Sequence, residues 1–358
     1  MVNKFNNIYK GRKVFITGHT GFKGSWICLL LHKLGADVYG YALDPPTNPS
    51  LFIEANVGEI ITSTIGDIRD YKFLLQTIKE IQPEIIIHMA AQPLVMESYK
   101  NPRETYEINV MGTVNIFESA RQVESVKVIL NITTDKCYEN KEWHWGYREN
   151  EPMGGYDPYS SSKGCSELIT GAFRNSYFNI DSFEKHGIVI ASARAGNVIG
   201  GGDWAADRLI PDFIRSIIEG EQLKIRNPYS IRPWQHVLEP LSGYITLVAK
   251  MSDIGIKYSG AWNFGPDDRD AKNVEWITNK LCELWGNGIS YEIDINPQPH
   301  EASYLKLDCS KANNELLWFP KWNIEKAIEL IIEWNKAWLG KGDIRQVCIK
   351  QIEEYFNK

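Results

Sequence analysis

A tyrosine and a lysine four residues apart are the first candidates for catalysis. Tyr159 and Lys163 follow Asp157 and Pro158, which can cap a helix and occupy its first turn. On that helix the two side chains would share one face. An ammonium group beside a phenol favours the phenolate, so we expect Tyr159 to accept a hydroxyl proton near neutral pH, below its reference pKa of about 10. The alternative is an ordinary exposed helix face, because such pairs are common.

A glycine-rich turn near the N-terminus is the candidate site for a dinucleotide. An apolar run over 13–17 is followed by Gly18, Gly21 and Gly24 and then by the apolar stretch 26–34. This order predicts a strand, a turn and a helix, whose first N–H groups can hold a pyrophosphate. A tight turn without a ligand is the alternative. The candidates for cofactor contact in this turn are Gly18, His19, Gly21, Phe22, Lys23 and Gly24.

A carboxylate ends the second predicted strand. Asp44 lies about 20 residues beyond the glycines, where it can bind the ribose 2′-hydroxyl and favour NAD over NADP. The sequence Asp44-Pro45-Pro46 is also typical of a turn, so a purely structural role for Asp44 stays open beside the ribose-binding role. Further candidates for cofactor contact follow the ends of later predicted strands, at Asp67, Ile68, Ala90 and Gln92.

Alternating apolar strands and helical stretches must position these residues. Strands are expected at 13–17, 37–43, 60–65, 85–88, 126–132 and 187–193, and helices at 71–81, 102–123 and 324–339. Continuous apolar strands predict an α/β fold with a Rossmann-type doubly wound parallel sheet. We expect an NAD-binding domain over 1–193 with later chain crossings back to it. Residues 194–358 would form mainly a smaller C-terminal α/β lobe that binds the substrate.

Taken together, these motifs resemble the extended short-chain dehydrogenase/reductase family. The likeness rests on the glycine turn 17–24, Thr134 and the Tyr159/Lys163 pair, and it spans nearly the whole chain. Within that family, segments of the chain are most similar to the CDP-D-glucose 4,6-dehydratases. These segments are 19–23, 44–47, 134–138, 147–149, 157–159 and 232–236.

The resemblance implies conversion of CDP-D-glucose into CDP-4-keto-6-deoxy-D-glucose and water, with internal hydride transfer through bound NAD. Tyr159 would take the proton of the sugar 4-hydroxyl, and Thr134 would hydrogen-bond the same oxygen. Elimination then needs a base for the C5 proton and an acid for the leaving 6-hydroxyl, and Asp135 and Lys136 are the candidates. Other 6-deoxy-forming relatives commonly carry a carboxylate at the position of Lys136, so the division of roles stays open.

Several alternatives accompany this interpretation. Asp135 and Lys136 can instead form a solvated turn at a strand end. The protein can act on another nucleotide sugar as a 4,6-dehydratase, or it can be a 4-epimerase, which needs no acid and base at those two positions. An NAD-binding regulator without activity is a third alternative, against which the intact Thr134, Tyr159 and Lys163 argue.

Candidates for contact with the nucleotide sugar lie in the second half of the chain. Arginine presents a planar fork of donors to phosphate oxygens, although each arginine can instead sit in a structural ion pair. The substrate-binding candidates are Arg194, Asn197, Arg208, Leu209, Arg232 and His300, with Asn263, Gly265 and Glu301 as further ones near the sugar or base.

The composition argues against other classes of protein. The 358 residues include 45 acidic and 39 basic ones, a net charge of -6, without a run of Lys and Arg that tracks nucleic acid. No stretch of about 18 apolar residues and no signal peptide stand out, so we expect a cytoplasmic protein with no membrane partner. Six scattered cysteines lack metal-site spacing, so we expect no metal. We also expect a homo-oligomer, a dimer or a tetramer.

Overall fold

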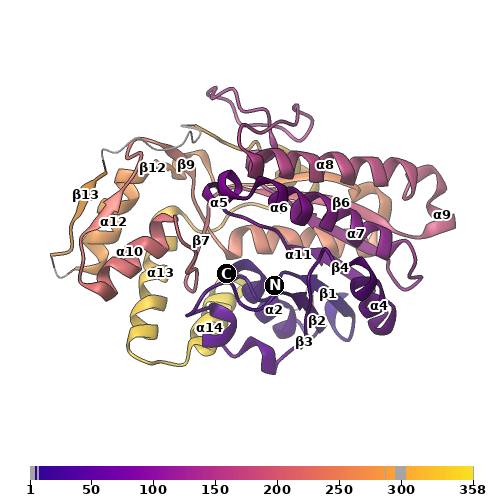
Figure 1. Ribbon diagram of the computed structural model, residues 1–358, viewed down its shortest axis with the longest axis horizontal. Coiled ribbons are helices and arrows are strands. Elements are labelled where there is room, and N and C mark those ends of the chain that lie inside the picture. Colours follow the sequence, from indigo (N-terminus) through magenta and orange to yellow (C-terminus); the bar gives the residue numbers. More distant parts are fainter. Residues whose placement is uncertain (1–4, 6–7, 287, 295–303, 358) are drawn as a thin grey trace.

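A parallel sheet forms the centre of the molecule, with helices on both faces and a smaller lobe to one side (Figure 1). The computed structural model describes residues 5, 8–286, 288–294 and 304–357. Within this part of the chain, a seven-stranded sheet has the order β11-β6-β5-β4-β1-β2-β3, with every neighbouring pair parallel. Its strands are β1 (Lys13–Thr17), β2 (Asp37–Ala42), β3 (Thr62–Ile65), β4 (Ile85–His88), β5 (Val128–Ile132), β6 (Val189–Ala195) and β11 (Gly260–Phe264).

The strand order confirms the predicted doubly wound Rossmann-type sheet. From β1 the chain proceeds in one direction to β2 and β3, and then in the other direction to β4, β5 and β6. In such sheets ligands bind beyond the carboxyl ends of the strands, at the point where the order reverses. This point lies between β1 and β4, directly after Thr17 and His88.

Both faces of the sheet are buried, which explains why its strands are apolar without alternation. Val14 and Ile16 of β1 pack on one side, in a core shared with the helices α2 (Phe22–Lys33) and α11 (Leu238–Asp253). Phe15 points to the opposite core. That core is covered by α4 (Tyr71–Ile81), α7 (Gly112–Ala120) and α8 (Pro158–Ser176).

The long helix predicted between β4 and β5 contains one wider turn. It consists of α6 (Pro102–Tyr106), a π-helical turn (Glu107–Met111) and α7. A π turn inserts one extra residue and shifts the side chains that follow it, and such turns are frequent near functional sites. Here the buried Asn109 of the turn donates from its amide to the Ser162 hydroxyl of α8 at 2.9 Å. The turn therefore holds the helix on which Tyr159 and Lys163 lie.

The smaller lobe is built on short strands and two helices, seen on the left of Figure 1. Strand β8 pairs with β13 in parallel, and β9 pairs with β12 in antiparallel fashion. The elements of this lobe are α10 (Leu209–Glu219), β8 (Leu223–Ile225), β9 (Ile231–Pro233), β12 (Ala271–Asn273), α12 (Val274–Trp285) and β13 (Tyr291–Ile293).

The chain returns to the sheet after residue 194. Helix α11 covers one face of the sheet, and β11 forms its edge beside β6. The helix expected near the C-terminus is present with the expected bounds, as α13 (Ile324–Leu339). A further helix that the sequence did not predict, α14 (Ile344–Asn357), packs on α2. Within the described residues, no helix has the length and apolar character needed to cross a membrane.

Candidate active site

Two cavities meet at the carboxyl ends of the strands. The larger cavity, about 540 Å³, lies over the glycine turn, and the smaller cavity, about 320 Å³, extends toward the α10/β8 lobe. They share part of their walls. The residues that line both include Phe22, Lys23, Thr133, Tyr159 and Arg208. Groups bound in the two cavities would therefore both contact these shared side chains.

The glycine turn forms the floor of the larger cavity, and its three glycines have different reasons to be there. Gly18 has a φ of +79°, and a Cβ on it would lie 2.8 Å from the Ala90 nitrogen. A Cβ on Gly24 would lie 2.0 Å from the Gly18 carbonyl oxygen. Gly21 is different, because its Cβ would have that oxygen at 3.5 Å as its nearest neighbour. Gly21 caps α2 without a side chain, so the first N–H groups of this helix face the cavity.

Most of the candidates for cofactor contact line the larger cavity. They are Gly18, Gly21, Phe22, Lys23, Gly24, Asp44, Asp67, Ile68, Ala90, Tyr159 and Lys163. Asp44 lies at the end of β2, as a ribose-binding carboxylate would, and it is exposed. The Asp67 carboxylate accepts a hydrogen bond from the Arg69 guanidinium at 2.6 Å. Among the described residues, no group of three or more His, Cys, Asp or Glu side chains is placed to hold a metal ion.

His19 and Gln92, two further candidates for cofactor contact, do not line either cavity. The His19 ring is fully buried behind the turn, with its Nε2 2.7 Å from the Ser63 hydroxyl, and a Cβ on Gly40 would collide with it. Burial lowers the pKa of His19 to about 4, so the ring is neutral and offers no charge to a phosphate. The Gln92 amide donates to the Thr105 hydroxyl at 2.9 Å and does not line either cavity.

Tyr159 and Lys163 lie on the first turns of α8, where the two cavities meet. The Asp157 carboxylate accepts from the Ser160 nitrogen at 2.9 Å, which confirms the predicted cap. Both side chains are buried, and the Lys163 ammonium donates to the Ile132 carbonyl at 3.3 Å. The Thr134 hydroxyl hydrogen-bonds the Tyr159 phenol. The helix therefore presents the phenol and the ammonium to one point of the cavity wall.

The ionisation of this pair differs from the prediction. Burial raises the pKa of Tyr159 to about 12, and it lowers the pKa of Lys163 to about 8. Burial therefore has a larger effect on the pKa of Tyr159 than any nearby charge has in this structure. The physical reason is that loss of solvent disfavours both charged forms, and the ammonium is bound to the Ile132 carbonyl.

A short turn after β5 brings the remaining catalytic candidates beside Tyr159. The Thr134 hydroxyl accepts from the Lys136 nitrogen and donates to Asp135 Oδ1 at 3.0 Å. Asp135 is buried against Gly196, whose missing Cβ leaves the space for Asp135 Oδ2. That oxygen has no hydrogen-bond partner among the described residues. Burial raises the pKa of Asp135, against the opposing effect of Lys136. The smaller cavity thus contains a carboxyl group and an amine in its wall.

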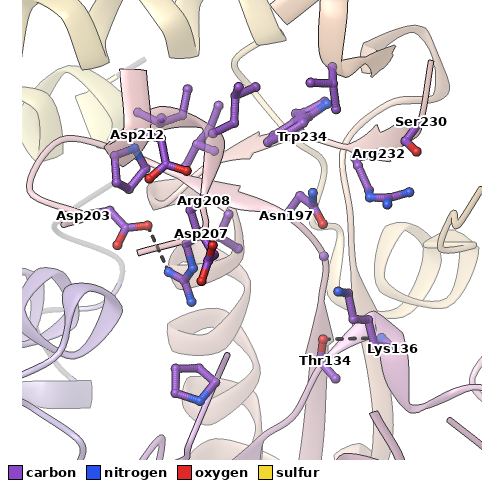
Figure 2. A pocket seen from close by; sticks show the side chains of 18 of the residues that line it. Thr134, Lys136, Asn197, Asp203, Asp207, Arg208, Asp212, Ser230, Arg232 and Trp234 are labelled. Carbon is purple, nitrogen blue, oxygen red and sulfur yellow. Dashed lines mark hydrogen bonds and ion pairs between the residues drawn. The ribbon is translucent and has the colours of Figure 1, made fainter. Parts of the chain in front are cut away.

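Figure 2 shows the substrate-binding candidates around the smaller cavity, with Arg232 and Asn197 on the side of Lys136 and Arg208 on the other. The Arg208 guanidinium donates to the Asp203 carboxylate at 2.9 Å, and Arg232 is largely buried. Leu209 also lines this cavity. His300 and Glu301 lie outside the described residues.

Arg194 and Asn263 do not line either cavity. The Arg194 guanidinium forms a buried ion pair with the Glu167 carboxylate at 2.7 Å, the structural role that the sequence had left open. The Asn263 amide donates to the carbonyls of Tyr147 and Asp308. Gly265 donates its N–H to the Cys309 sulfur. These three positions serve the interior of the protein.

Sequence reasoning missed much of the wall of the smaller cavity. Apolar side chains from the small lobe and one carboxylate of α10 face into it. They are Leu223, Ile225, Val274, Trp234 and Asp212. The tryptophan stands in the segment 232–236, which the resemblance had already singled out. The others lie on short strands and helix starts, whose position beside the site only the tertiary fold determines.

Comparison with known proteins agrees with this geometry. The model of a family described as GDP-mannose 4,6 dehydratase matches residues 15–331. A CDP-glucose 4,6-dehydratase of Salmonella typhimurium is 57% identical over 358 residues, which cover 100% of this chain and 99% of that protein.

Solved structures show the same fold. A UDP-glucose 4-epimerase of Thermotoga maritima has a TM-score of 0.78 at 20% identity, and the match covers 91% of this chain and 99% of that one. A dTDP-glucose 4,6-dehydratase of Streptomyces venezuelae, solved with NAD bound, has a TM-score of 0.75 at 21% identity and covers 93% and 99%. Because the family match spans most of the chain and the relative exceeds half identity, the chain belongs to the GDP-mannose 4,6-dehydratase family.

Proposed function

We propose that this protein is an NAD-dependent nucleotide-sugar 4,6-dehydratase that converts CDP-D-glucose into CDP-4-keto-6-deoxy-D-glucose and water. One observation carries the proposal: Asp135 and Lys136 stand in the wall of the smaller cavity, beside Tyr159. Elimination of water needs an acid and a base beyond the Tyr159/Lys163 pair, whereas epimerisation at C4 does not. The choice of CDP-glucose follows the full-length Salmonella relative named above.

The larger cavity fits NAD. Its floor is the N-terminus of a helix, where Gly21 leaves space for a diphosphate to bind. Asp44, at the edge of the cavity, can accept a hydrogen bond from a ribose hydroxyl. Lys163 stands in its wall next to Tyr159. When bound, NAD supplies the redox chemistry, since it accepts a hydride from the sugar and later gives it back.

The side chains of this protein would move the protons. Tyr159 takes the proton of the sugar 4-hydroxyl, and Thr134, which hydrogen-bonds the phenol, orients the same oxygen. A ketone at C4 acidifies the hydrogen at C5, which a base must remove. Asp135 is the candidate for the acid that protonates the departing 6-hydroxyl, because it is buried in the cavity wall and burial raises its pKa. Lys136 is then the candidate for the C5 proton. Arg208 and Arg232 would bind the diphosphate of the substrate.

Two glycine variants test the cofactor cavity as a matched pair. In Gly21→Ala the new methyl group meets only ordinary contacts, so the protein should fold normally and bind NAD about tenfold more weakly or worse. In Gly24→Ala the methyl group collides with the Gly18 backbone, so the midpoint of thermal unfolding should fall by more than about 5 °C. Calorimetric titration and thermal unfolding measure the two effects. Normal NAD affinity in Gly21→Ala would show that the diphosphate of NAD does not bind at this turn.

Turnover of a panel of sugar nucleotides tests the substrate and the reaction. Among the CDP, dTDP, UDP and GDP derivatives of glucose, we expect a 4-keto product from CDP-glucose, detected by its ultraviolet absorbance, with no net reduction of NAD. Substrate deuterated at C4 should give product deuterated at C6, because the hydride is returned to the same sugar. Loss of the label to solvent would contradict this path. Formation of CDP-galactose without water loss would instead identify an epimerase.

A homo-oligomeric cytoplasmic enzyme is part of the same proposal. Large apolar side chains are exposed on helical segments that contact one another, namely Tyr106 on α6, Met111 in the π-helical turn and Leu168 on α8. Exposed apolar groups gathered in this way are typical of a surface that contacts another protein chain. We therefore favour a dimer or a tetramer.

A further inference from the structure

A buried ion pair lies directly behind the catalytic turn. Glu167 and Arg194 form it at 2.7 Å, and each side chain is only 4% exposed. Glu167 Oε2 also accepts from the Ser192 hydroxyl at 2.7 Å, and Glu167 Oε1 accepts from the Thr133 hydroxyl. Arg194 in turn donates to the Tyr138 hydroxyl at 2.6 Å. The mechanism above uses none of these groups, although they contact both ends of the turn between Thr133 and Tyr138.

Helix α8 holds the end of β5 at two consecutive residues. The Lys163 ammonium donates to the carbonyl of Ile132 at 3.3 Å, and Glu167, one helical turn later, binds the hydroxyl of Thr133. The next residue along the chain is Thr134, whose hydroxyl contacts Tyr159. A shift of the Thr133 contact would therefore move the turn relative to the phenol, and displacements of about 1 Å can cost catalysis on the order of 100-fold.

Glu167 also determines the charge near Lys163. Burial lowers the pKa of Lys163 to about 8, and the Glu167 carboxylate is the strongest of the opposing groups, followed by Cys137. The other ionisable groups around the ammonium do not help to keep it charged. The pKa of the Cys137 thiol is raised well above its ordinary value, and that of His88 is lowered to about 3, so both are neutral. Lys23 repels the ammonium.

The carboxylate itself is kept ionised by its own partners. Burial alone would raise the pKa of Glu167, but the Arg194 guanidinium and the hydroxyls of Thr133 and Ser192 lower it below its ordinary value. Arg194 thus stabilises the negative charge that Lys163 needs. This gives the arginine a role in the site although it does not line either cavity.

We propose that Glu167, supported by Arg194, is a positioning residue of the dehydratase reaction: it fixes the turn that carries Thr134, Asp135 and Lys136, and its charge keeps Lys163 protonated. The part of this inference that concerns the reaction rests on the proposed function. The part that concerns the protonation of Lys163 does not. A purely structural pair would also be buried and well bonded, since buried ion pairs often contribute little net stability. The test must therefore measure something other than folding.

The main test uses the double variant Glu167→Gln/Arg194→Met, which removes both charges and leaves no buried ion unpaired. Competitive acylation of Lys163 with acetic anhydride across a pH series, quantified by peptide mass spectrometry, gives the titration midpoint of this lysine. In the wild type the midpoint should lie at about 8. In the double variant it should fall by at least about one pH unit, the low end of the effect of a nearby opposite charge. Ser192→Ala, which removes one hydrogen bond but keeps the carboxylate, should leave it unchanged.

Turnover should follow the same titration. Because the positive charge of Lys163 beside Tyr159 favours the ionised phenol that accepts the proton, activity should be present below the Lys163 pKa and should be lost as the pH rises through it. The loss should therefore begin at lower pH in the double variant than in the wild type or in Ser192→Ala. Thr133→Val isolates the other half of the proposal, since it removes the hydroxyl that holds the turn. Its kcat should fall about tenfold or more with little change in KM.

The possible results distinguish a failure of the role proposed for Glu167 from a failure of the proposed function. An unchanged Lys163 midpoint in the double variant would overturn the electrostatic part, and a normal kcat in Thr133→Val would overturn the positioning part. If the double variant does not fold, Glu167→Asp replaces it, because it keeps the charge on a shorter side chain. In that variant the midpoint should stay near that of the wild type while kcat falls. A wild-type protein that makes no product from CDP-glucose would refute the proposed function, and the acylation result would still decide the role of Glu167.

Discussion

Replacing Tyr159 with Phe should reduce the turnover of CDP-D-glucose by about two to four orders of magnitude, the usual effect of losing a general base. The aromatic ring remains, so the packing around it and the affinity for NAD should change little. Only the phenolic oxygen, which the Thr134 hydroxyl contacts where the two cavities meet, is lost. Steady-state kinetics and calorimetric titration with NAD measure the two quantities.

A matched tyrosine lies three residues earlier in the chain. Tyr156 is 79% exposed and lines neither cavity, so Tyr156→Phe should leave both turnover and NAD affinity unchanged. Turnover of Tyr159→Phe within about threefold of the wild type would mean that another group takes the 4-hydroxyl proton. A large loss of NAD affinity would instead give the phenol a role in binding the cofactor.

The second large effect is expected for Lys136→Met, which keeps the length of the side chain and removes the amino group. If Lys136 serves the elimination, oxidation at C4 can still occur while the loss of water slows by about two orders of magnitude or more. Mixing this variant with substrate and NAD should then give the absorbance of reduced nicotinamide with little 4-keto-6-deoxy product. Rapid-mixing spectroscopy measures the first signal, and chromatography of the sugar nucleotides measures the second.

Lys141 provides the control for this experiment. It is exposed, five residues from Lys136, and lines neither cavity, so Lys141→Met should make product at the wild-type rate. A normal rate in Lys136→Met would leave Asp135 as the candidate for both steps of the elimination. A variant that neither reduces NAD nor makes product would assign Lys136 to substrate binding or to the first oxidation.

Local patterns in the sequence were sufficient to predict six of the seven strands of the sheet, all except the edge strand β11. The strands β1 and β4 begin and end at the predicted residues, because apolar runs buried on both faces leave little choice of secondary structure. The Asp157 cap and Pro158 likewise define the start of α8. The strands of the smaller lobe were not predicted. They have three residues each, too few for a periodic pattern, and they are stabilised by pairing with distant segments.

The candidate site was predictable where residue type and position alone determine the role. The glycine turn and the Tyr159/Lys163 pair belong to this class. The burial of individual side chains, by contrast, is not revealed by a single sequence. His19 stands in the turn beside Gly18, but its ring points into the protein, where it is neutral. Arg194 ends β6 near the site, yet the carboxylate that binds it comes from another part of the chain.

The shared wall of the two cavities couples their ligands thermodynamically. Lys23 lines both cavities, and burial together with the charges of Lys163 and Arg208 lowers its pKa to about 7, so near neutral pH the amine is only partly protonated. A diphosphate bound in either cavity favours the ammonium form and draws a proton from solvent. The second ligand then meets a lysine that is already charged. By linkage, each ligand alters the affinity for the other to the same extent, and the size of this effect depends on the proton concentration.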